Sequence, residues 1–174
     1  MFIPDIDFLC GVALKHAKSN DLAGVQYCLA YGADASETDE DGRNAVHHMA
    51  LHANFDALDF LAADDILHFY KADNNGVTPI MLLAEAGHGA YLAQLYAEHP
   101  TIKLTAHPEA EQTVAGFLAA SGYAELVVNT LLPKCDDIRH ERVIAQVMQS
   151  TTLKPTEKMK AVRLLSQAGF SSVM

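Results

Sequence analysis

The stretch DNNGVTPIM at residues 73–81 repeats the frame of DEDGRNAVH at residues 39–47. Both stretches begin with an aspartate, place a glycine three residues later and continue into a partly apolar run. The frame returns 35 residues further on, where Thr113 stands in the place of Thr78. A period of about 33 residues is typical of stacked repeats, in which no unit can bury its apolar face alone. The sequence therefore predicts similar units that pack against their neighbours.

Helix start and stop signals divide the chain into about five units, each with two helices joined by a short turn. Glycine marks many of the predicted helix ends, because it adopts the left-handed conformation without a steric clash. One domain over residues 1–174 is expected to hold units at about 5–37, 38–72, 73–106, 107–138 and 139–174, the last a divergent cap. The predicted helix pairs run over residues 11–18 and 22–31, 45–53 and 56–63, 79–86 and 90–98, 113–120 and 124–132, and 141–151 and 156–168.

An alanine recurs at one position of the first helix in four units, at Ala17, Ala50, Ala84 and Ala119. A small side chain there lets the following helix approach closely, so these alanines are predicted to be equivalent and buried. The second helices carry larger apolar residues at spacings of three and four, which place them on one buried face. The connectors at residues 35–43, 70–77 and 104–112 are polar and are predicted to be extended, finger-like loops. Together these features predict an all-α fold with little strand.

Residues 73–88 resemble the frame D-x-x-G-x-T-P-L-H…A…G-H of the ankyrin-repeat family. The stretch GADAS at residues 32–36 resembles the family's G-A-D-V-N ending, and His47 stands at the position of its structural histidine. The resemblance is good over about residues 10–132 and loose over 140–170, where residues 151–155, TTLKP, replace a tight glycine turn. The resemblance implies an ankyrin-like solenoid of about five stacked helix-turn-helix repeats with finger loops.

The resemblance also implies a function and a surface. Ankyrin repeats usually contact a protein partner through their concave face, which the finger tips and the exposed side of the first helices form. The chain is therefore expected to be a non-catalytic protein-binding module, an adaptor or a subunit of a complex. The family's contact positions map onto Glu40, Asp41, Arg43, His48, Leu51, His52, Asn74, Asn75, Val77, Glu85, Glu109, Gln112 and Phe117.

The distribution of charge favours a protein partner with a basic surface. The formal net charge is −10, and residues 1–75 hold 13 acidic and 4 basic side chains. This asymmetry argues against nucleic acid and anionic membranes as partners. A solvated acidic face that only maintains solubility explains the same charge equally well. Half of the residues are apolar, which is typical of a globular chain.

The pair His48 and His52 suggests a metal site, since the two residues lie four positions apart on one predicted helix face. No cysteine, aspartate or glutamate lies at the spacing of a third ligand on that helix, so neither a metal nor another cofactor is predicted. The acidic run at residues 39–41 lacks the pattern of a calcium loop and is predicted to be solvated. The chain contains no motif of a catalytic nucleophile or a phosphate-binding loop, so it is not expected to be an enzyme.

The three cysteines, Cys10, Cys28 and Cys135, indicate buried thiols in a reducing compartment, and hence the cytoplasm. No apolar run reaches 18 residues, so no membrane span is predicted. Residues 1–7 carry acids and a proline where a signal peptide would carry lysines. The aromatic residues of the second helices, Tyr27, Phe60, Tyr91 and Tyr96, are predicted to pack in the core.

Two other functions stay open. The chain fits a regulatory domain or subunit of an enzyme, and it fits a bacterial effector that is delivered into a host cell and acts on a host protein. The protein alone is expected to be monomeric.

Overall fold

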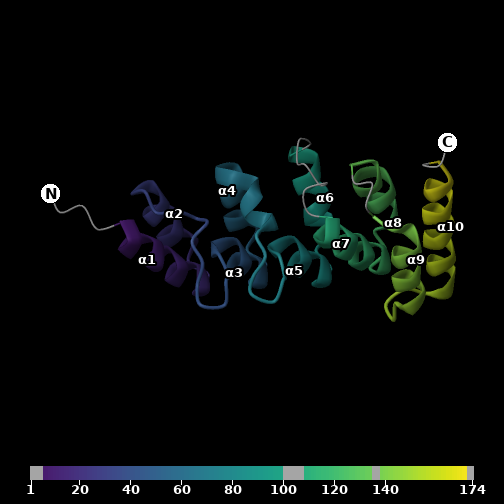
Figure 1. The fold of residues 1–174 in the computed structure, drawn as a ribbon, viewed down its shortest axis with the longest axis horizontal. Coiled ribbons are helices and arrows are strands. Elements are labelled where there is room, and N and C mark those ends of the chain that lie inside the picture. The colour runs from purple at the N-terminus through teal and green to yellow at the C-terminus, as the bar shows by residue number, and fades with distance from the viewer. Residues whose placement is uncertain (1–5, 100–107, 135–137, 172–174) are drawn as a thin grey trace. The chain divides into compact units, whose positions relative to one another are not determined.

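The computed structural model describes residues 6–99, 108–134 and 138–171, and within these ranges every regular element is a helix (Figure 1). The predicted all-α class is therefore confirmed for the described part of the chain. The chain divides into two compact units, Met1–Leu82 and Leu83–Met174. Among the described residues, no helix is long and apolar enough to cross a membrane.

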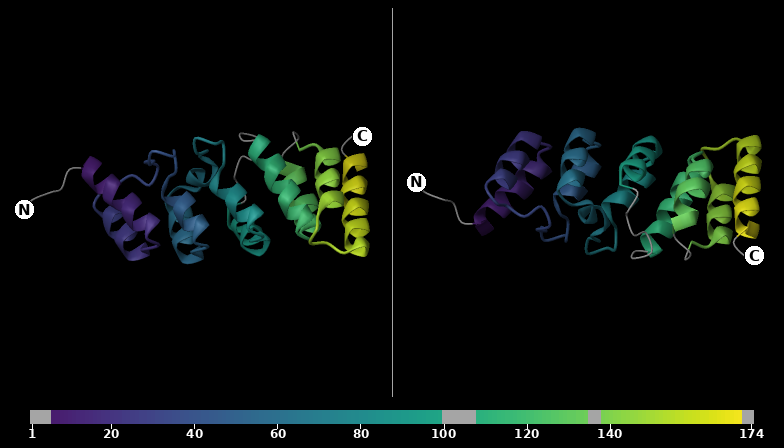
Figure 2. Two further views of the ribbon diagram at one scale, coloured as in Figure 1. Left: turned by 90° about the horizontal axis from the view of Figure 1, so that it is seen from below. Right: turned by 90° about the horizontal axis from the view of Figure 1, so that it is seen from above.

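The first unit consists of two helix pairs that lie side by side. Its helices are α1 (Ile6–Lys18), α2 (Leu22–Ala30), α3 (Ala45–Leu51) and α4 (Phe55–Asp65), followed by a 3-10 turn at Ile66–Tyr70. Helix α1 contacts both its partner α2 and the first helix of the next pair, α3 (Figure 2). The predicted pairing of helices is confirmed here.

Helix α5 (Pro79–Glu85) spans the boundary between the two units. The second unit continues with α6 (Gly89–Glu98), α7 (Pro108–Ala120), α8 (Ala124–Leu126), a π-helical turn (Val127–Leu131), a 3-10 turn (Leu132–Lys134), α9 (His140–Gln149) and α10 (Pro155–Ser171). Helix α9 lies against both α7 and α10.

Three predicted helices differ clearly from the structure, and the first of them is α1, which begins at Ile6 rather than at Gly11. The helix predicted over residues 124–132 is regular only in α8 and then widens into the π-helical turn. A 3-10 turn at Leu132–Lys134 follows, and it contains Pro133, which has no amide hydrogen to donate to an α-helix. Helix α7 begins at Pro108 rather than at Thr113, because proline is favoured in the first turn of a helix. Part of the predicted connector 104–112 is therefore helical, and residues 104–107 lie outside the described ranges.

One turn geometry joins the two helices in four of the pairs. Its left-handed residue is Asn20, Ala53, Gly87 or Gly122, with φ of 58°, 50°, 82° and 99°. The amide of that residue donates to the carbonyl of Ala17, Ala50, Ala84 or Ala119, over 3.0–3.3 Å. The amide of the next residue donates to the carbonyl five positions back, as in a Schellman motif. The four alanines are at most 4% exposed, so the prediction that they are equivalent and buried is confirmed.

Substitutions at the left-handed residue of this turn test how much its backbone conformation contributes to stability. Gly87→Ala is expected to lower the free energy of unfolding by about 1–2 kcal/mol, because an alanine pays for a positive φ that glycine adopts freely. A Cβ at Gly87 meets no atom within 4 Å, so the cost comes from the backbone alone. The reverse change, Ala53→Gly, is expected to leave stability equal or higher. Urea denaturation measures both, and a loss of stability in Ala53→Gly would contradict this account.

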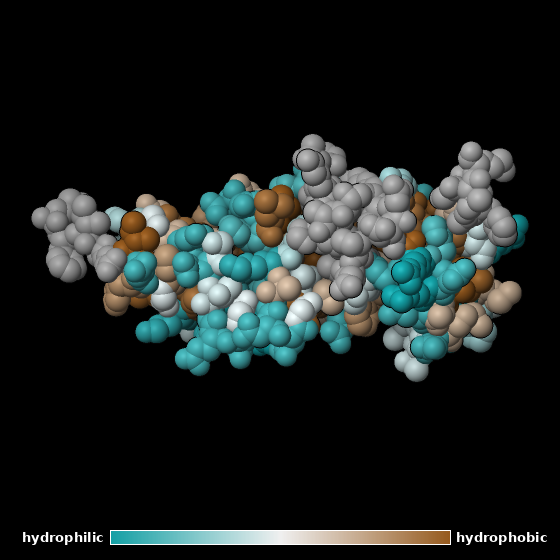
Figure 3. All heavy atoms as spheres, viewed as in Figure 1, coloured by the Kyte–Doolittle hydropathy of each residue, from teal (hydrophilic) through white to brown (hydrophobic). Residues whose placement is uncertain are grey.

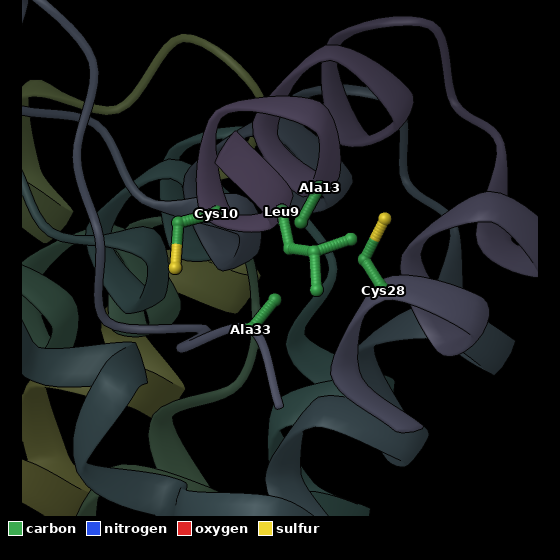
Figure 4. Packing of buried hydrophobic residues seen from close by; sticks show 5 residues of the cluster. All are labelled: Leu9, Cys10, Ala13, Cys28 and Ala33. Carbon is green, nitrogen blue, oxygen red and sulfur yellow. The ribbon is translucent and has the colours of Figure 1, made fainter. Parts of the chain in front are cut away.

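The core of the first pair contains both cysteines of the first unit. Leu9, Cys10 and Ala13 of α1 pack with Cys28 of α2 and with Ala33 (Figure 4). Both thiols are free and buried, as predicted, and burial raises the pKa of the Cys28 thiol. The sulfur of Cys10 accepts a hydrogen bond from the backbone amide of Asp34 at 3.2 Å. Cys135 lies outside the described residues.

The aromatic residues of the second helices divide into two groups. Tyr91 and Tyr96 of α6 are buried, as predicted, and Phe60 of α4 is half-buried. The prediction is wrong for Tyr27, which is 61% exposed on α2. Its ring packs instead against that of Tyr31, one helical turn away, with 4.6 Å between the ring centroids.

Candidate functional site

The first unit carries two finger loops that contain the same turn. In the first finger, the amide of Asp39 donates to the carbonyl of Arg43 at 3.0 Å. In the second, the amide of Asp73 donates to the carbonyl of Val77 at 2.8 Å. In each turn, the amide of the glycine donates to the carbonyl of the aspartate at 2.9 Å. The φ angle of this glycine is 79° in the first finger, at Gly42, and 77° in the second. The repeat seen in the sequence is therefore a repeat in backbone geometry.

The aspartate side chain closes each finger from inside. Atom Oδ1 of Asp39 accepts hydrogen bonds from the amides of Asp41 and Arg43, at 3.1 and 3.0 Å. Atom Oδ1 of Asp73 accepts the two matching bonds, from the amides of Asn75 and Val77, at 2.8 and 3.0 Å. An aspartate at this position can satisfy two loop amides at once, which explains why the turn begins with this residue.

The second oxygen of each aspartate pairs with cationic or histidine side chains. Oδ2 of Asp39 lies 2.9 Å from Nζ of Lys18 and 3.0 Å from Nε2 of His48. Oδ2 of Asp73 lies 3.2 Å from Nε of Arg43. The side chains of Asp39 and Asp73 are only 8% and 1% exposed. The prediction that the whole acidic run 39–41 is solvated is therefore wrong for Asp39, because its carboxylate is a structural acceptor.

These contacts shift the protonation equilibria of the site. Burial alone would raise the pKa of Asp39, but the hydrogen bonds from Lys18, the Arg43 amide and His48 outweigh it and hold that pKa well below its ordinary value. The same balance of burial against hydrogen bonds lowers the pKa of Asp73. Burial lowers the pKa of His48 despite the neighbouring carboxylate.

Replacing Asp39 by asparagine is expected to lower the free energy of unfolding at pH 7 by about 1–3 kcal/mol, since Lys18 and His48 lose a charged acceptor. The depressed folded-state pKa of Asp39 stabilises the fold above its unfolded value of about 3.9, and this stability is lost as the pH falls further. The gap between wild type and Asp39→Asn should therefore narrow below about pH 4. Urea denaturation at pH 7 and at acidic pH measures it. Asp41→Asn is the matched control, since its side chain is exposed and makes no hydrogen bond that the described residues show.

The two fingers are clasped to each other by Asn74. Its amide donates to the carbonyl of Asp41 at 2.9 Å, and its side-chain Nδ2 donates to the carbonyl of Glu40 at 2.8 Å. Lys71 adds a bond from Nζ to the carbonyl of Ser36. A Cβ on Gly42 would stand 2.6 Å from Oδ1 of Asn74 and 2.9 Å from its backbone nitrogen. Only glycine fits at this point of close approach.

His47 fastens the second finger to α3. It caps the helix together with Asn44, whose amide donates to Nδ1 of His47 at 3.2 Å, while Nε2 lies 3.1 Å from the carbonyl of Val77. Burial lowers the pKa of His47. A neutral ring with its hydrogen on Nε2 satisfies these two contacts, while Nδ1 also lies 2.6 Å from Oδ1 of Asn44, which can only accept. His47 is fully buried and has the structural role that the resemblance implies.

The two histidines whose spacing suggested a metal site, His48 and His52, have different partners in the structure. His48 is only 8% exposed and bonds Asp39, so the expectation that it lies on the exposed contact surface is wrong. His52 is exposed, and its Nε2 lies 3.1 Å from the carbonyl of Lys18. Within the described ranges, no group of three or more histidine, cysteine, aspartate or glutamate residues is arranged to hold a metal ion.

The other predicted contact residues of the first unit gather on the fingers and at the end of α3. Hydrophilic residues line the edge of the surface view where the two finger loops lie (Figure 3). Glu40, Asp41, Asn74, Asn75 and Leu51 are exposed, the last to 53%. Arg43 and Val77 are half-buried.

The second unit holds the remaining predicted residues. Glu85 is exposed, and Phe117 is half-buried on α7. Gln112 is also half-buried, and its Oε1 accepts a hydrogen bond from the amide of Arg139 at 2.6 Å, which ties α7 to the start of α9. The side chain of Glu109 lies outside the described residues.

A groove that the sequence analysis missed lies between α1 and the first finger. It has a volume of about 440 Å³ and is lined by Gly11, Leu14, Lys15, Lys18, Thr38, Asp39, Glu40 and Asp41. Its four α1 residues follow the i, i+3, i+4, i+7 spacing of one helix face. This spacing was visible in the sequence, but the finger that forms the opposite wall was not. A second hollow, of about 630 Å³, lies in the other unit between the turn at residues 121–123 and α10.

Comparison with known proteins finds similarity to ankyrin repeats in part of the chain. Residues 13–62 match the family described as ankyrin repeats (many copies). The chain is 24% identical over 154 residues to a protein of Acanthamoeba polyphaga mimivirus that is named for its ankyrin repeats; the match covers 88% of this chain and 21% of that protein. A shorter match, 47% identical over 49 residues, is to alpha-latroinsectotoxin-Lt1a of Latrodectus tredecimguttatus and covers 28% of this chain and 4% of the toxin. The chain thus spans about a fifth of the first relative and much less of the second.

Proposed function

We propose that this chain is a non-catalytic protein-binding module, an adaptor or a subunit of a complex, because residues 13–62 match ankyrin repeats. Its partner contacts the finger tips and the exposed side of the first helices. Repeat stacks of this kind generally bind proteins through such extended surfaces.

The observation that carries this proposal is the contrast between the fixed backbone and the free side chains of the fingers. Internal aspartate caps and the Asn74 clasp hold the finger backbone. The side chains of Glu40, Asp41 and Asn75 project from it without any hydrogen bond or ion pair shown among the described residues. A surface whose backbone is ordered before binding loses little conformational entropy when a partner docks.

A partner with a basic surface suits this unit best. Glu37, Glu40 and Asp41 are exposed on one finger. The excess of acidic residues in the N-terminal half extends their field beyond the finger itself. Opposite charges mainly accelerate association and select among partners, and Leu51, exposed at the C-terminal end of α3, offers apolar contact that slows dissociation.

The kinetic test uses the protein that the chain captures in stoichiometric amount from its source cell. Asp41→Lys is expected to slow association and flatten its dependence on salt, since a charge that steers the partner is reversed. Leu51→Ala is expected to raise the dissociation rate and leave association unchanged. Surface plasmon resonance at several salt concentrations measures both rates. Asp56→Lys, an exposed aspartate on α4, is the matched control. Equal rates in all three variants would contradict binding at this surface.

A second candidate is a regulatory domain or subunit of an enzyme, or a bacterial effector that acts on a host protein. The length of the viral relative, of which this chain spans 21%, favours it. Both candidates use the same surface. A reducing compartment is proposed for either, supported by the free, buried thiols of Cys10 and Cys28.

A further inference from the structure

The groove between α1 and the first finger has two unlike walls. On the α1 side, Gly11 is exposed and Leu14 is half-buried, so this wall is open and partly apolar. A Cβ at Gly11 would meet nothing within 4 Å, which leaves room beside the helix. On the finger side stand the carboxylates of Glu40 and Asp41. The groove therefore combines a surface for an aliphatic chain with acceptors for a charged end.

The charges in the groove favour a cationic ligand. Lys18 and Asp39 neutralise each other across 2.9 Å at one end of the groove. The other charged residues of the lining are one lysine, Lys15, and two acids, Glu40 and Asp41, and none of these three side chains has an ion pair among those that the structure shows. The unpaired lining charge is thus negative, in the half of the chain that is most acidic.

We infer that this groove takes an arginine side chain of the protein partner. Its aliphatic stem lies along Gly11 and Leu14, and its guanidinium meets Glu40 and Asp41. A planar guanidinium can donate to two carboxylate oxygens at once, which suits this wall better than a compact ammonium. The Lys18–Asp39 pair acts as a positioning contact, because it holds the finger at its distance from α1. The inference rests on the proposed function, since it names the group that the partner presents.

A change at Gly11 distinguishes binding in this groove from nonspecific electrostatic attraction to the acidic surface. Gly11→Leu fills the groove without changing any charge, and the open space around the residue leaves no contact to break. Leucine also favours the helix more than glycine does, so the thermal midpoint should stay equal or rise. Ala23→Leu, at an exposed position on α2 outside the groove, is the matched control.

The test titrates N-acetyl-arginine methylamide into the isotope-labelled full chain and follows the backbone resonances by NMR. Shifts should centre on Gly11, Lys15 and Asp41, persist in Ala23→Leu and weaken by about tenfold or more in Gly11→Leu. The norleucine and glutamate analogues should leave these resonances in place. The inference is overturned if the groove resonances do not move, if the glutamate analogue moves them, or if Gly11→Leu shifts as the wild type does.

The same variants separate this inference from the proposed function. If the captured partner binds Gly11→Leu as tightly as wild type while Asp41→Lys slows its association, the finger surface is correct and the groove is wrong. If neither change alters the binding, both are wrong.

Discussion

Replacing Leu95 by alanine is expected to lower the free energy of unfolding by about 2–5 kcal/mol. Leu95 lies on α6 and is only 1% exposed, so alanine removes buried methyl groups and leaves a cavity that the neighbours fill only in part. Urea denaturation followed by circular dichroism measures the change in midpoint and slope. The slope matters because a repeat protein can unfold in parts, and an unchanged slope shows that the same transition is compared.

The control variant replaces a leucine that is exposed to solvent instead of buried. Leu67 is 61% exposed in the 3-10 turn after α4, so Leu67→Ala should change stability by less than about 0.5 kcal/mol. A loss near zero for Leu95→Ala would mean that the apolar stripe of α6 does not face the core. If both variants lost the same free energy of unfolding, burial of the leucine would not determine how much stability its removal costs.

The second large effect is expected for Gly42→Ala, at about 2–5 kcal/mol. About 1–2 kcal/mol comes from placing alanine at a φ of 79°. The remainder comes from the clash of the new Cβ with Asn74, whose backbone nitrogen stands 2.9 Å away and cannot turn aside as a side chain can. Thermal unfolding and amide exchange in both fingers measure the loss.

Gly76→Ala separates the two contributions. Gly76 has nearly the same φ, 77°, but a Cβ there meets nothing within 4 Å. Its variant should lose only the backbone part, about 1–2 kcal/mol. The difference between the variants is then the cost of forcing the fingers apart. Equal losses would mean that the fingers separate freely, contrary to the Asn74 clasp.

The sequence predicted the helix pairs well because their signals are local. Turn residues such as Asn20 and Gly87 act within one or two helical turns, and the recurring alanines mark the same turn in four of the pairs. The helix predicted over residues 124–132 is α-helical only over Ala124–Leu126, because no residue before Pro133 signals that the helix widens into a π-helical turn.

The candidate site was predicted in part. The finger tips follow from the spacing of aspartate and glycine, but the partners of Asp39 do not, because Lys18 stands 21 positions away and bonds it only after the two pairs stack. His48 was placed in the open for the same reason: its helical position is local information, whereas the carboxylate that covers it comes from the finger. The groove beside Gly11 likewise exists only once α1 and the finger are together.

In the first finger, the residues that fix the loop backbone are different from the residues whose side chains are exposed, and this affects which substitutions the protein tolerates. Asp39 and Gly42 shape the first loop, and Asn74 grips it only through the carbonyls of Glu40 and Asp41, which every amino acid possesses. The side chains at positions 40 and 41 can therefore vary without altering the bonds that hold them. Substitutions there are open to selection for new partners at little cost to folding, so recognition at this surface can drift while the scaffold stays the same.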